Sequence, residues 1–179
     1  MIFSELSLKD AYIIEIERLK DERGFFARSW CQREMKEHGL NARLVQCNIS
    51  FNAKRGTLRG MHYQAKPFEE AKLIRCTVGS VYDVIVDLRP ESKSFKQHIG
   101  IALTADSRKM VFVPEGFAHG FLTLEDNTEV FYQMSEFYAP DHASGFRWND
   151  PAFGIRWPRQ IRVISERDRT YADFDSSRS

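Results

Sequence analysis

Short strand-like runs dominate this sequence and constrain its fold more than any other feature. Apolar and polar residues alternate along them, which is the period of a β-strand whose two faces meet different environments. Turn residues such as Gly79-Ser80, Pro90 and Ala105-Asp106 separate the runs. Many short strands at regular spacing indicate a β-sandwich or barrel. The predicted strands cover residues 45–51, 72–78, 81–88, 98–104, 110–113 and 129–138.

Helix is scarce, and only Cys31 to His38, which ends at Gly39, has a convincing helical pattern in the first half. A chain of 179 residues is long enough to bury a sizeable core, so we expect one domain over residues 1–179. Its polar end, from about residue 172 and closing in DSSRS, is expected to fray.

The charge balance limits the partners of the protein. With 26 basic and 25 acidic residues the formal charge is +1, so no general attraction to nucleic acid or to a membrane follows. No segment is long and apolar enough to span a bilayer. Three cysteines without CxxC spacing are typical of a reducing compartment. We therefore expect a soluble, cytoplasmic protein that meets any anionic ligand with local arginines.

Polar side chains recur on faces that should be apolar. In the strand 45–51, Gln46, Asn48 and Ser50 share one face. Lys72 shares a face with Ile74, and a buried lysine is rare unless it is paired or functional.

Two phenols, Tyr132 and Tyr138, share a face of the strand 129–138. A plainer alternative stays open, in which Lys72 reaches solvent from a strand end and the tyrosines are ordinary core residues.

The segment PEGFAHGF at 114–121 contains the pattern P-x-G-x-x-H. This pattern resembles the second signature of cupins, which are small double-sheet barrels of the jelly-roll class. Metal-binding cupins supply a His-x-His pair and an acid from their first motif, but the matching place here reads His62-Tyr63-Gln64. Two isolated histidines, His62 and His119, are poor metal spacing, so we expect no metal and no other cofactor.

Several further motifs carry a closer resemblance, in order along the chain. They read DERGFF at 21–26, QCNIS at 46–50, LRGMHYQ at 58–64, KLIRC at 72–76, and WND at 148–150 followed by GIRWP at 154–158. Together the motifs resemble those of the dTDP-4-dehydrorhamnose 3,5-epimerase family. The resemblance implies a metal-free cupin jelly roll, all-β with a few short helices, that is usually a homodimer. It also implies inversion of C3, C5 or both in a nucleotide-diphosphate-linked 4-keto-6-deoxy hexose, for deoxysugar and polysaccharide biosynthesis.

The family chemistry assigns four roles. Inverting a carbon beside a ketone needs a base on one face, a donor for the enolate oxygen and an acid on the opposite face. By resemblance His62 is the base, Lys72 stabilises the enolate at O4, and Tyr132 is the acid. Asp168 matches the aspartate that holds the imidazole, although its charged ERDR context would also suit a solvated turn.

Candidates for binding the diphosphate are Arg23 and Arg59, because the planar guanidinium matches phosphate oxygens. His119 adds a hydrogen bond there or is a structural residue in a tight turn. Regular strand parity places Arg59 and His62 on opposite faces. Either Gly60 marks a bulge that realigns them, or Arg59 reaches the ligand from the rim or across a dimer.

One departure from the family concerns the nucleotide base. Where the family pattern FFxE has a glutamate that accepts from thymine, this chain has Arg28, which can only donate. Cytosine offers N3 and O2 as acceptors, so a CDP-linked sugar is one hypothesis. In the alternative, Arg28 points away and thymine binds between Phe26 and Tyr138.

A second departure is Cys47, which replaces a family acid on the face opposite Gln46 and Asn48. We interpret it as repacking outside the site, with the polar set of substrate-binding residues kept. Three other functions stay open: a single-centre 3- or 5-epimerase, a sugar ketoisomerase and a non-catalytic nucleotide-sugar-binding cupin. The joint presence of the four catalytic candidates favours an enzyme.

Overall fold

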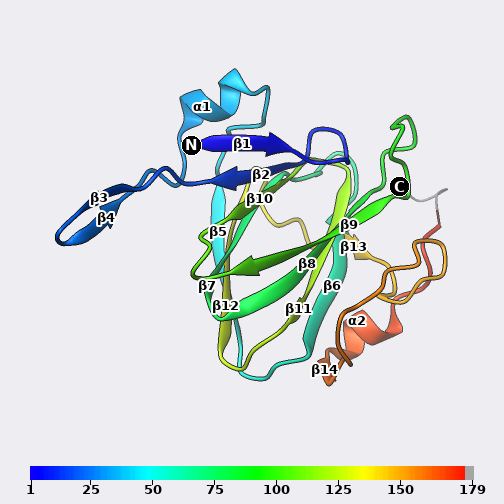
Figure 1. The fold of residues 1–179 in the computed structure, drawn as a ribbon. Coiled ribbons are helices and arrows are strands. Elements are labelled where there is room, and N and C mark those ends of the chain that lie inside the picture. The colour runs from blue at the N-terminus through cyan, green and yellow to red at the C-terminus, as the bar shows by residue number, and fades with distance from the viewer. Residues whose placement is uncertain (176–179) are drawn as a thin grey trace.

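The computed structural model describes residues 1–175, and two facing sheets form its body (Figure 1). The first sheet has the strand order β1 (Ile2–Glu5), β2 (Tyr12–Glu15), β10 (Met110–Val113), β7 (Lys72–Val78), β12 (Thr128–Met134) and β5 (Gln46–Asn52). The second has the order β13 (Ala143–Gly145), β6 (Thr57–Gln64), β11 (Phe117–Thr123), β8 (Ser80–Asp87) and β9 (His98–Thr104), and β14 (Val163–Ile164) pairs with β6. The expected cupin-like jelly roll is confirmed.

The core lies between the two sheets and is built from the alternate residues that each strand turns inward. Ile74 and Val130 come from the first sheet, and Ile85 and Leu103 from the second; all four are fully buried in one cluster. Burial of such side chains contributes about 1.5–3 kcal/mol each, so the alternation visible in the sequence specifies which face of every strand packs.

Three small elements lie outside the sheets. The hairpin of β3 (Leu19–Asp21) and β4 (Gly24–Phe26) projects away from the barrel (Figure 1). Helix α1 (Gln32–Glu37) falls within the helix expected at Cys31 to His38, and Gly39 follows with φ +72°. Helix α2 (Glu166–Thr170) lies near the C-terminus, where the sequence indicated only a charged run.

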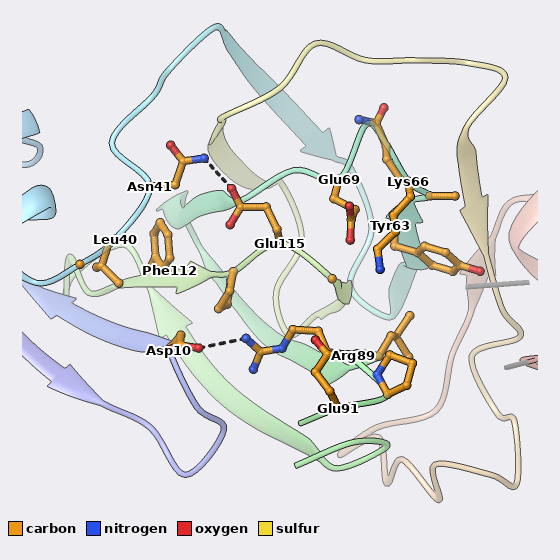
Figure 2. Close-up of a pocket in the computed structure, with 17 residues that line it drawn as sticks. Asp10, Leu40, Asn41, Tyr63, Lys66, Glu69, Arg89, Glu91, Phe112 and Glu115 are labelled. Atoms are coloured by element: carbon orange, nitrogen blue, oxygen red, sulfur yellow. Dashed lines mark hydrogen bonds and ion pairs between the residues drawn. The ribbon is translucent and has the colours of Figure 1, made fainter. Parts of the chain in front are cut away.

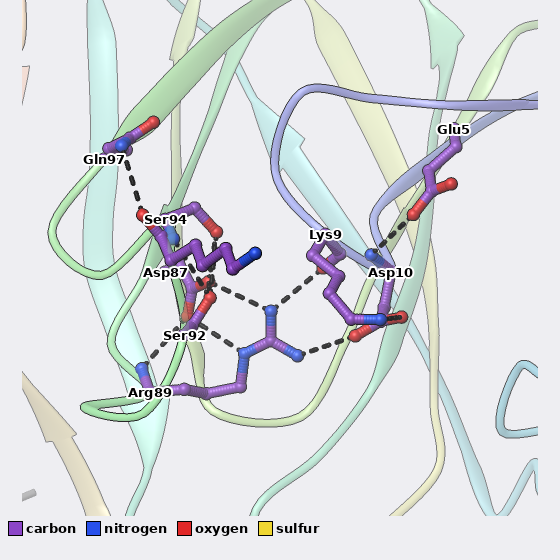
Figure 3. Close-up of polar contacts among 9 residues, drawn as sticks. Glu5, Lys9, Asp10, Asp87, Arg89, Ser92, Ser94 and Gln97 are labelled. Atoms are coloured by element: carbon purple, nitrogen blue, oxygen red, sulfur yellow. Dashed lines mark hydrogen bonds and ion pairs between the residues drawn. The ribbon is translucent and has the colours of Figure 1, made fainter.

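A buried ionic network fixes the loop after β8 (Figure 3). Asp87 is fully buried and accepts hydrogen bonds from Arg89 Nε at 3.0 Å and from the hydroxyls of Ser92 and Ser94, both at 2.6 Å. Arg89 also donates to Asp10 at 3.0 Å, which joins the N-terminal segment to this loop. Burial would raise the pKa of Asp87, but the bonds from Arg89 and the serines outweigh it and the pKa is lowered.

The strand expected at 129–138 is shorter than predicted. β12 ends at Met134, because Ser135 turns to the start of β7: its N–H donates to the Ala71 carbonyl at 3.0 Å and its hydroxyl accepts from the Ala71 N–H at 2.8 Å. Tyr138 therefore belongs to the following loop and does not share a strand face with Tyr132.

The C-terminal segment is anchored as far as Phe174. Its ring packs against those of Phe146 and Phe153 with centroids 5.8 and 5.4 Å away, and Asp173 pairs with Arg147 at 2.7 Å. The fraying predicted for the final DSSRS falls on residues 175–179, of which 176–179 lie outside the described residues. No helix within residues 1–175 is long and apolar enough to cross a membrane, and the cytoplasmic location stays a prediction.

Candidate active site

Two adjoining cavities of about 340 and 300 Å³ open between the sheets. His62, Lys72 and Tyr132 line both of them. The remaining predicted residues that line one cavity or the other are Gln46, Asn48, Arg59, His119 and Tyr138. The structure thus brings together side chains that lie as far as 92 positions apart in sequence, as in the bond between Gln46 and the Tyr138 N–H.

A bulge at Gly60 explains how Arg59 and His62, which are three positions apart and would lie on opposite faces of a regular strand, can face the same side. Along β6, His62 pairs with His119 of β11 and Arg59 pairs with Phe121, and the register shifts between these pairs. Gly60 has φ +133°, and a Cβ there would lie 2.6 Å from the backbone of β11, so only glycine fits. The bulge turns both side chains toward the cavity, whereas regular alternation would separate them.

Asp168 is held in the first turn of α2, which corrects the interpretation of this run as a solvated turn. The Ser165 hydroxyl caps the helix by accepting from the Asp168 N–H at 3.1 Å. The buried carboxylate accepts from His62 Nε2 at 2.7 Å and from the Gly60 N–H at 3.1 Å. It therefore holds both the imidazole and the bulge that orients it.

The charge of Asp168 determines which imidazole nitrogen is basic. Burial would raise the pKa of Asp168, but the hydrogen bond and charge of His62 and the Gly60 N–H outweigh it and the pKa is lowered. An ionised carboxylate can only accept, so we assign the proton to Nε2 of His62 and leave Nδ1 as the basic nitrogen. The ring of Tyr171, which the sequence did not single out, packs edge-on against His62 at 6.1 Å.

Lys72 begins β7 and points inward, as parity predicts. Its side chain is only 9% exposed, so the alternative in which it reaches solvent from the strand end is wrong. Its ion-pair partner is Glu70, whose carboxylate is equally buried and lies 2.7 Å from the ammonium. No sequence motif singles out Glu70, although a carboxylate two positions before an inward-facing lysine shares its side of an extended chain.

Tyr132 faces His62 across the cavity. It belongs to β12 of the first sheet, whereas His62 belongs to β6 of the second, so the two approach a bound group from opposite sides. Burial raises the pKa of Tyr132; the charge of Arg59 opposes this and that of Glu70 adds to it. The phenol is consequently protonated at neutral pH and can act as a donor.

Arg59 and His119 lie at the second cavity. Arg59 Nε donates to the Asn52 side chain at 2.8 Å and Nη2 donates to the Phe51 carbonyl at 3.4 Å, while the residue as a whole is exposed. His119 Nε2 bonds to the fully buried Asp83 at 2.8 Å, which fixes the imidazole against β8. A cation and an oriented imidazole on one rim suit an anionic group such as phosphate.

Gln46 and Asn48 form the polar floor expected from strand alternation. Their amides bond to each other at 3.1 Å. The Gln46 carbonyl also accepts from the Tyr138 N–H at 3.1 Å, which holds the half-exposed ring of Tyr138 over the cavity mouth.

Three predicted binding residues do not reach this cavity within one chain. Arg23 pairs with Asp21 at 2.6 Å, and Arg28 pairs with Glu34 at 2.6 Å. Phe26 is 74% exposed on the projecting hairpin. The N-terminal ammonium and Arg28 lower the pKa of Glu34 to about 2, so Arg28 faces a permanent carboxylate.

A larger cavity of about 540 Å³ lies elsewhere, beyond Tyr63 (Figure 2). Two of its charged groups have partners, since Arg89 bonds to Asp10 and Glu115 accepts from Asn41. This cavity is larger than either of the adjoining two, but those two bring an imidazole, a buried ammonium and a phenol together. Within residues 1–175 no three His, Cys, Asp or Glu side chains gather as metal ligands, and the expectation of no cofactor stays a prediction.

Comparison with known proteins adds independent information. The sequence model of the dTDP-4-dehydrorhamnose 3,5-epimerase family matches residues 5–176. The chain belongs to this family. It is therefore an isomerase of the epimerase class.

Family members of known name or structure match most of the chain. An epimerase of that name from Methanothermobacter thermautotrophicus is 43% identical over 173 residues, which cover 94% of this chain and 92% of the relative. The Bacillus anthracis enzyme, solved with TDP and PPi bound, has a TM-score of 0.92 at 41% identity over 97% of this chain and 99% of its own. The Legionella pneumophila enzyme in complex with dTDP-4-keto-L-rhamnose has a TM-score of 0.88 at 33% identity, over 96% and 92%.

Proposed function

We propose that this epimerase inverts C3 and C5 of a dTDP-linked 4-keto-6-deoxy hexose in rhamnose biosynthesis. One observation carries the proposal: a carboxylate-held imidazole and a protonated phenol face one cavity from opposite sheets, with an ammonium beside them. Inversion requires removal of a proton from one face of a carbon and delivery of another to the opposite face. A binding protein has no need of such an arrangement, so the geometry favours an enzyme.

The reaction proceeds through an enolate. Nδ1 of His62 removes the proton from a carbon beside the C4 ketone, and the electron pair of that C–H bond delocalises onto O4. The ionised Asp168 stabilises the imidazolium that forms. The Lys72 ammonium balances the negative charge on O4, and one preorganised donor of this kind is worth about 3–4 kcal/mol.

Tyr132 completes the inversion. As the enolate collapses, its phenol donates a proton to the opposite face of the same carbon and becomes a phenolate. Proton exchange with water restores both side chains, so no net proton is consumed. The same groups then act on the second carbon beside the ketone.

The nucleotide lies on the rim of the cavity. Arg59 and His119 bind the diphosphate, which is supported by the relative solved with TDP and PPi. Gln46 and Asn48 hydrogen-bond polar groups of the bound nucleotide sugar. The pairing of Arg28 with Glu34 removes the reason to expect cytosine, so we assign thymine as the base.

The homodimer is part of this proposal. Phe26 and Leu19 on the projecting hairpin are 74% and 68% exposed, and Ile49 and Phe51 on the outer face of β5 are 64% and 56% exposed. Apolar side chains exposed this far are typical of an interface. We infer that the hairpin of each chain packs on its partner and delivers Phe26 and Arg23 to the partner's cavity mouth, while Arg28 stays paired with Glu34.

The experiment that tests the function is proton exchange in deuterated water, followed by NMR with dTDP-4-keto-6-deoxyglucose and its CDP analogue. Wild type is expected to place deuterium at C3 and C5 of the dTDP substrate and to form the inverted product. His62→Asn should abolish exchange at both carbons, and His38→Asn, at an exposed histidine that caps the C-terminus of α1, serves as the matched control. Label at one carbon alone would make the protein a single-centre epimerase; faster exchange with the CDP sugar would refute the thymine assignment.

A further inference from the structure

Glu70 is a buried carboxylate beside the catalytic cavity that the proposed reaction does not yet use. Its side chain is 4% exposed and it lines the same cavity as His62, Lys72 and Tyr132. The backbone next to it is fixed from both sides, because Ala71 donates to and accepts from Ser135 at the end of β12. Glu70 is therefore held in one place relative to β7, which carries Lys72, and β12, which carries Tyr132.

Glu70 forms a buried ion pair with Lys72, which is unfavourable in desolvation free energy. Glu70 Oε1 lies 2.7 Å from the Lys72 ammonium, and both groups are more than nine-tenths buried. Removing two charges from water is expensive, and a buried ion pair rarely adds net stability. Among the described residues Glu70 Oε2 has no hydrogen-bond partner, so the carboxylate is not placed for the best local bonding.

The arrangement does suit the reaction. An ammonium has three N–H donors on a flexible four-carbon stem. Glu70 takes up one donor and leaves two for a group bound in the cavity that Lys72 lines. Without this carboxylate the stem has many rotamers, and the buried cation has no fixed counter-charge.

We propose that Glu70 is a positioning residue that holds the Lys72 ammonium where O4 of the enolate forms. The inference rests on the proposed epimerase function and deepens it. Glu70 does not touch the substrate and acts through Lys72. Its negative charge also reaches Tyr132, the acid on the strand β12 that pairs with β7.

The groups around Tyr132 determine in which direction the charge of Glu70 shifts the pKa of the phenol. The titratable and charged groups that share its two cavities are Arg59, His62 and Tyr63 from β6, Glu70 and Lys72 at the start of β7, His119 from β11, Tyr138 from the loop after β12, and Arg167 from α2. Burial is the largest cause of the raised pKa of Tyr132, the positive charge of Arg59 opposes it, and the negative charge of Glu70 adds to it. Neutralising Glu70 removes a contribution that keeps the phenol protonated, so activity should be lost at lower pH on the alkaline side.

The test is deuterium exchange at C3 and C5 by wild type, Glu70→Gln, Glu70→Asp and Glu69→Gln. Glu69→Gln is the matched control, because it makes the same change of charge one residue away. The side chain of Glu69 lines the separate, larger cavity shown in Figure 2. Removing one preorganised donor outright costs about 10²- to 10³-fold in kcat. Since the amide can still accept from Lys72, Glu70→Gln should lower kcat about 10- to 100-fold with KM changed less than about 3-fold.

Two further readouts separate positioning from a loss of structure. The alkaline limb of the kcat profile should move to lower pH in Glu70→Gln and stay in place in Glu69→Gln. Glu70→Asp keeps the charge on a shorter stem. It should therefore recover part of kcat, and the alkaline limb of its kcat profile should lie at the wild-type pH. Binding of dTDP by calorimetry should be equal in all four proteins.

The outcomes distinguish the inference from the function on which it rests. If wild type exchanges both carbons and Glu70→Gln has the kcat and pH profile of Glu69→Gln, the inference is wrong and the epimerase function stands. If Glu70→Gln loses dTDP binding together with kcat and Glu70→Asp recovers neither, Glu70 is only structural. If wild type exchanges neither carbon, the proposed function fails and the role of Glu70 fails with it.

Discussion

Replacing Asp168 by asparagine is the most incisive perturbation of the candidate site, because it changes one charge without changing shape. The carboxylate accepts two hydrogen bonds, from His62 Nε2 at 2.7 Å and from the Gly60 N–H at 3.1 Å. Asparagine has one acceptor oxygen and one donor NH₂. In either orientation, one of the two native donors faces the NH₂ of the new side chain.

The two orientations both impair the base. If the NH₂ faces His62, the imidazole adopts the other tautomer and presents Nδ1–H to the cavity, where it cannot remove a proton. If the NH₂ faces Gly60, the buried N–H loses its acceptor, and the bulge that orients His62 is destabilised by about 1–3 kcal/mol. The lost stabilisation of the imidazolium adds to either case. An orienting carboxylate of this kind can be worth up to about 10⁴ in kcat, so we expect a loss of about 10²- to 10⁴-fold.

The assay is the initial rate of deuterium exchange at C3 and C5, with dTDP binding measured in parallel by calorimetry. Nucleotide binding should change much less than the exchange rate, because Arg59 keeps its own bonds to Asn52 and the Phe51 carbonyl and Asp168 reaches it only through the Gly60 bulge. Glu166→Gln makes the same change of charge at an exposed position of the same helix and should keep the wild-type rate. A rate for Asp168→Asn within about threefold of wild type would refute the assignment of Nδ1 as a base oriented by this carboxylate.

Three other predictions follow from the same structure. Tyr132→Phe should lower formation of inverted product about 100-fold, while NMR still detects deuterium in recovered substrate, because His62 can return a solvent-exchanged proton to the face from which it took one. Asp87→Asn should lower the free energy of unfolding by about 3–5 kcal/mol in denaturant titrations, since it leaves Arg89 without its buried partner. The pKa of Asp87 is lowered on folding, so the stabilisation from its ionised carboxylate is fully present above the unfolded pKa of about 4. This stabilisation disappears as the pH falls through the folded pKa. Below about pH 4 the free energy of unfolding of Asp87→Asn should therefore fall less with pH than that of wild type. Burial raises the pKa of the Cys76 thiol to about 11, so mass spectrometry after iodoacetamide treatment at pH 8 should find the exposed Cys47 alkylated and Cys76 intact.

Local patterns in the sequence correctly located six strands, β5, β7, β8, β9, β10 and β12, although β12 ends earlier than predicted. Alternation along 45–51 correctly predicted a polar face, and Gln46 and Asn48 line the cavity while Cys47 is exposed. Parity also predicted that Lys72 points inward, and its side chain is buried. These features depend on neighbours one or two positions away, which a period of two describes completely.

Predicting the face of a side chain from regular strand alternation gave wrong results where the chain departs from a regular strand. The bulge at Gly60 brings Arg59 and His62 to one side because Gly120 of β11 approaches too closely for any side chain. Tyr138 leaves the face of Tyr132 because Ser135 bonds to Ala71, which precedes β7. Both irregularities depend on contacts with a segment distant in sequence. The glycine indicated the bulge as one of two alternatives, whereas nothing near Ser135 indicated its bond to Ala71.

The sequence by itself determined the class of barrel, the family and the residue types that the chemistry needs. Only the tertiary structure decided how those residues are charged and aimed. The Asp168 carboxylate lies 106 positions from the imidazole it holds, and the sheet pairing of β7 with β12 sets Glu70 and Lys72 beside Tyr132. Burial and long-range hydrogen bonds set these properties, because the free energy of a charge depends on which groups surround it in space.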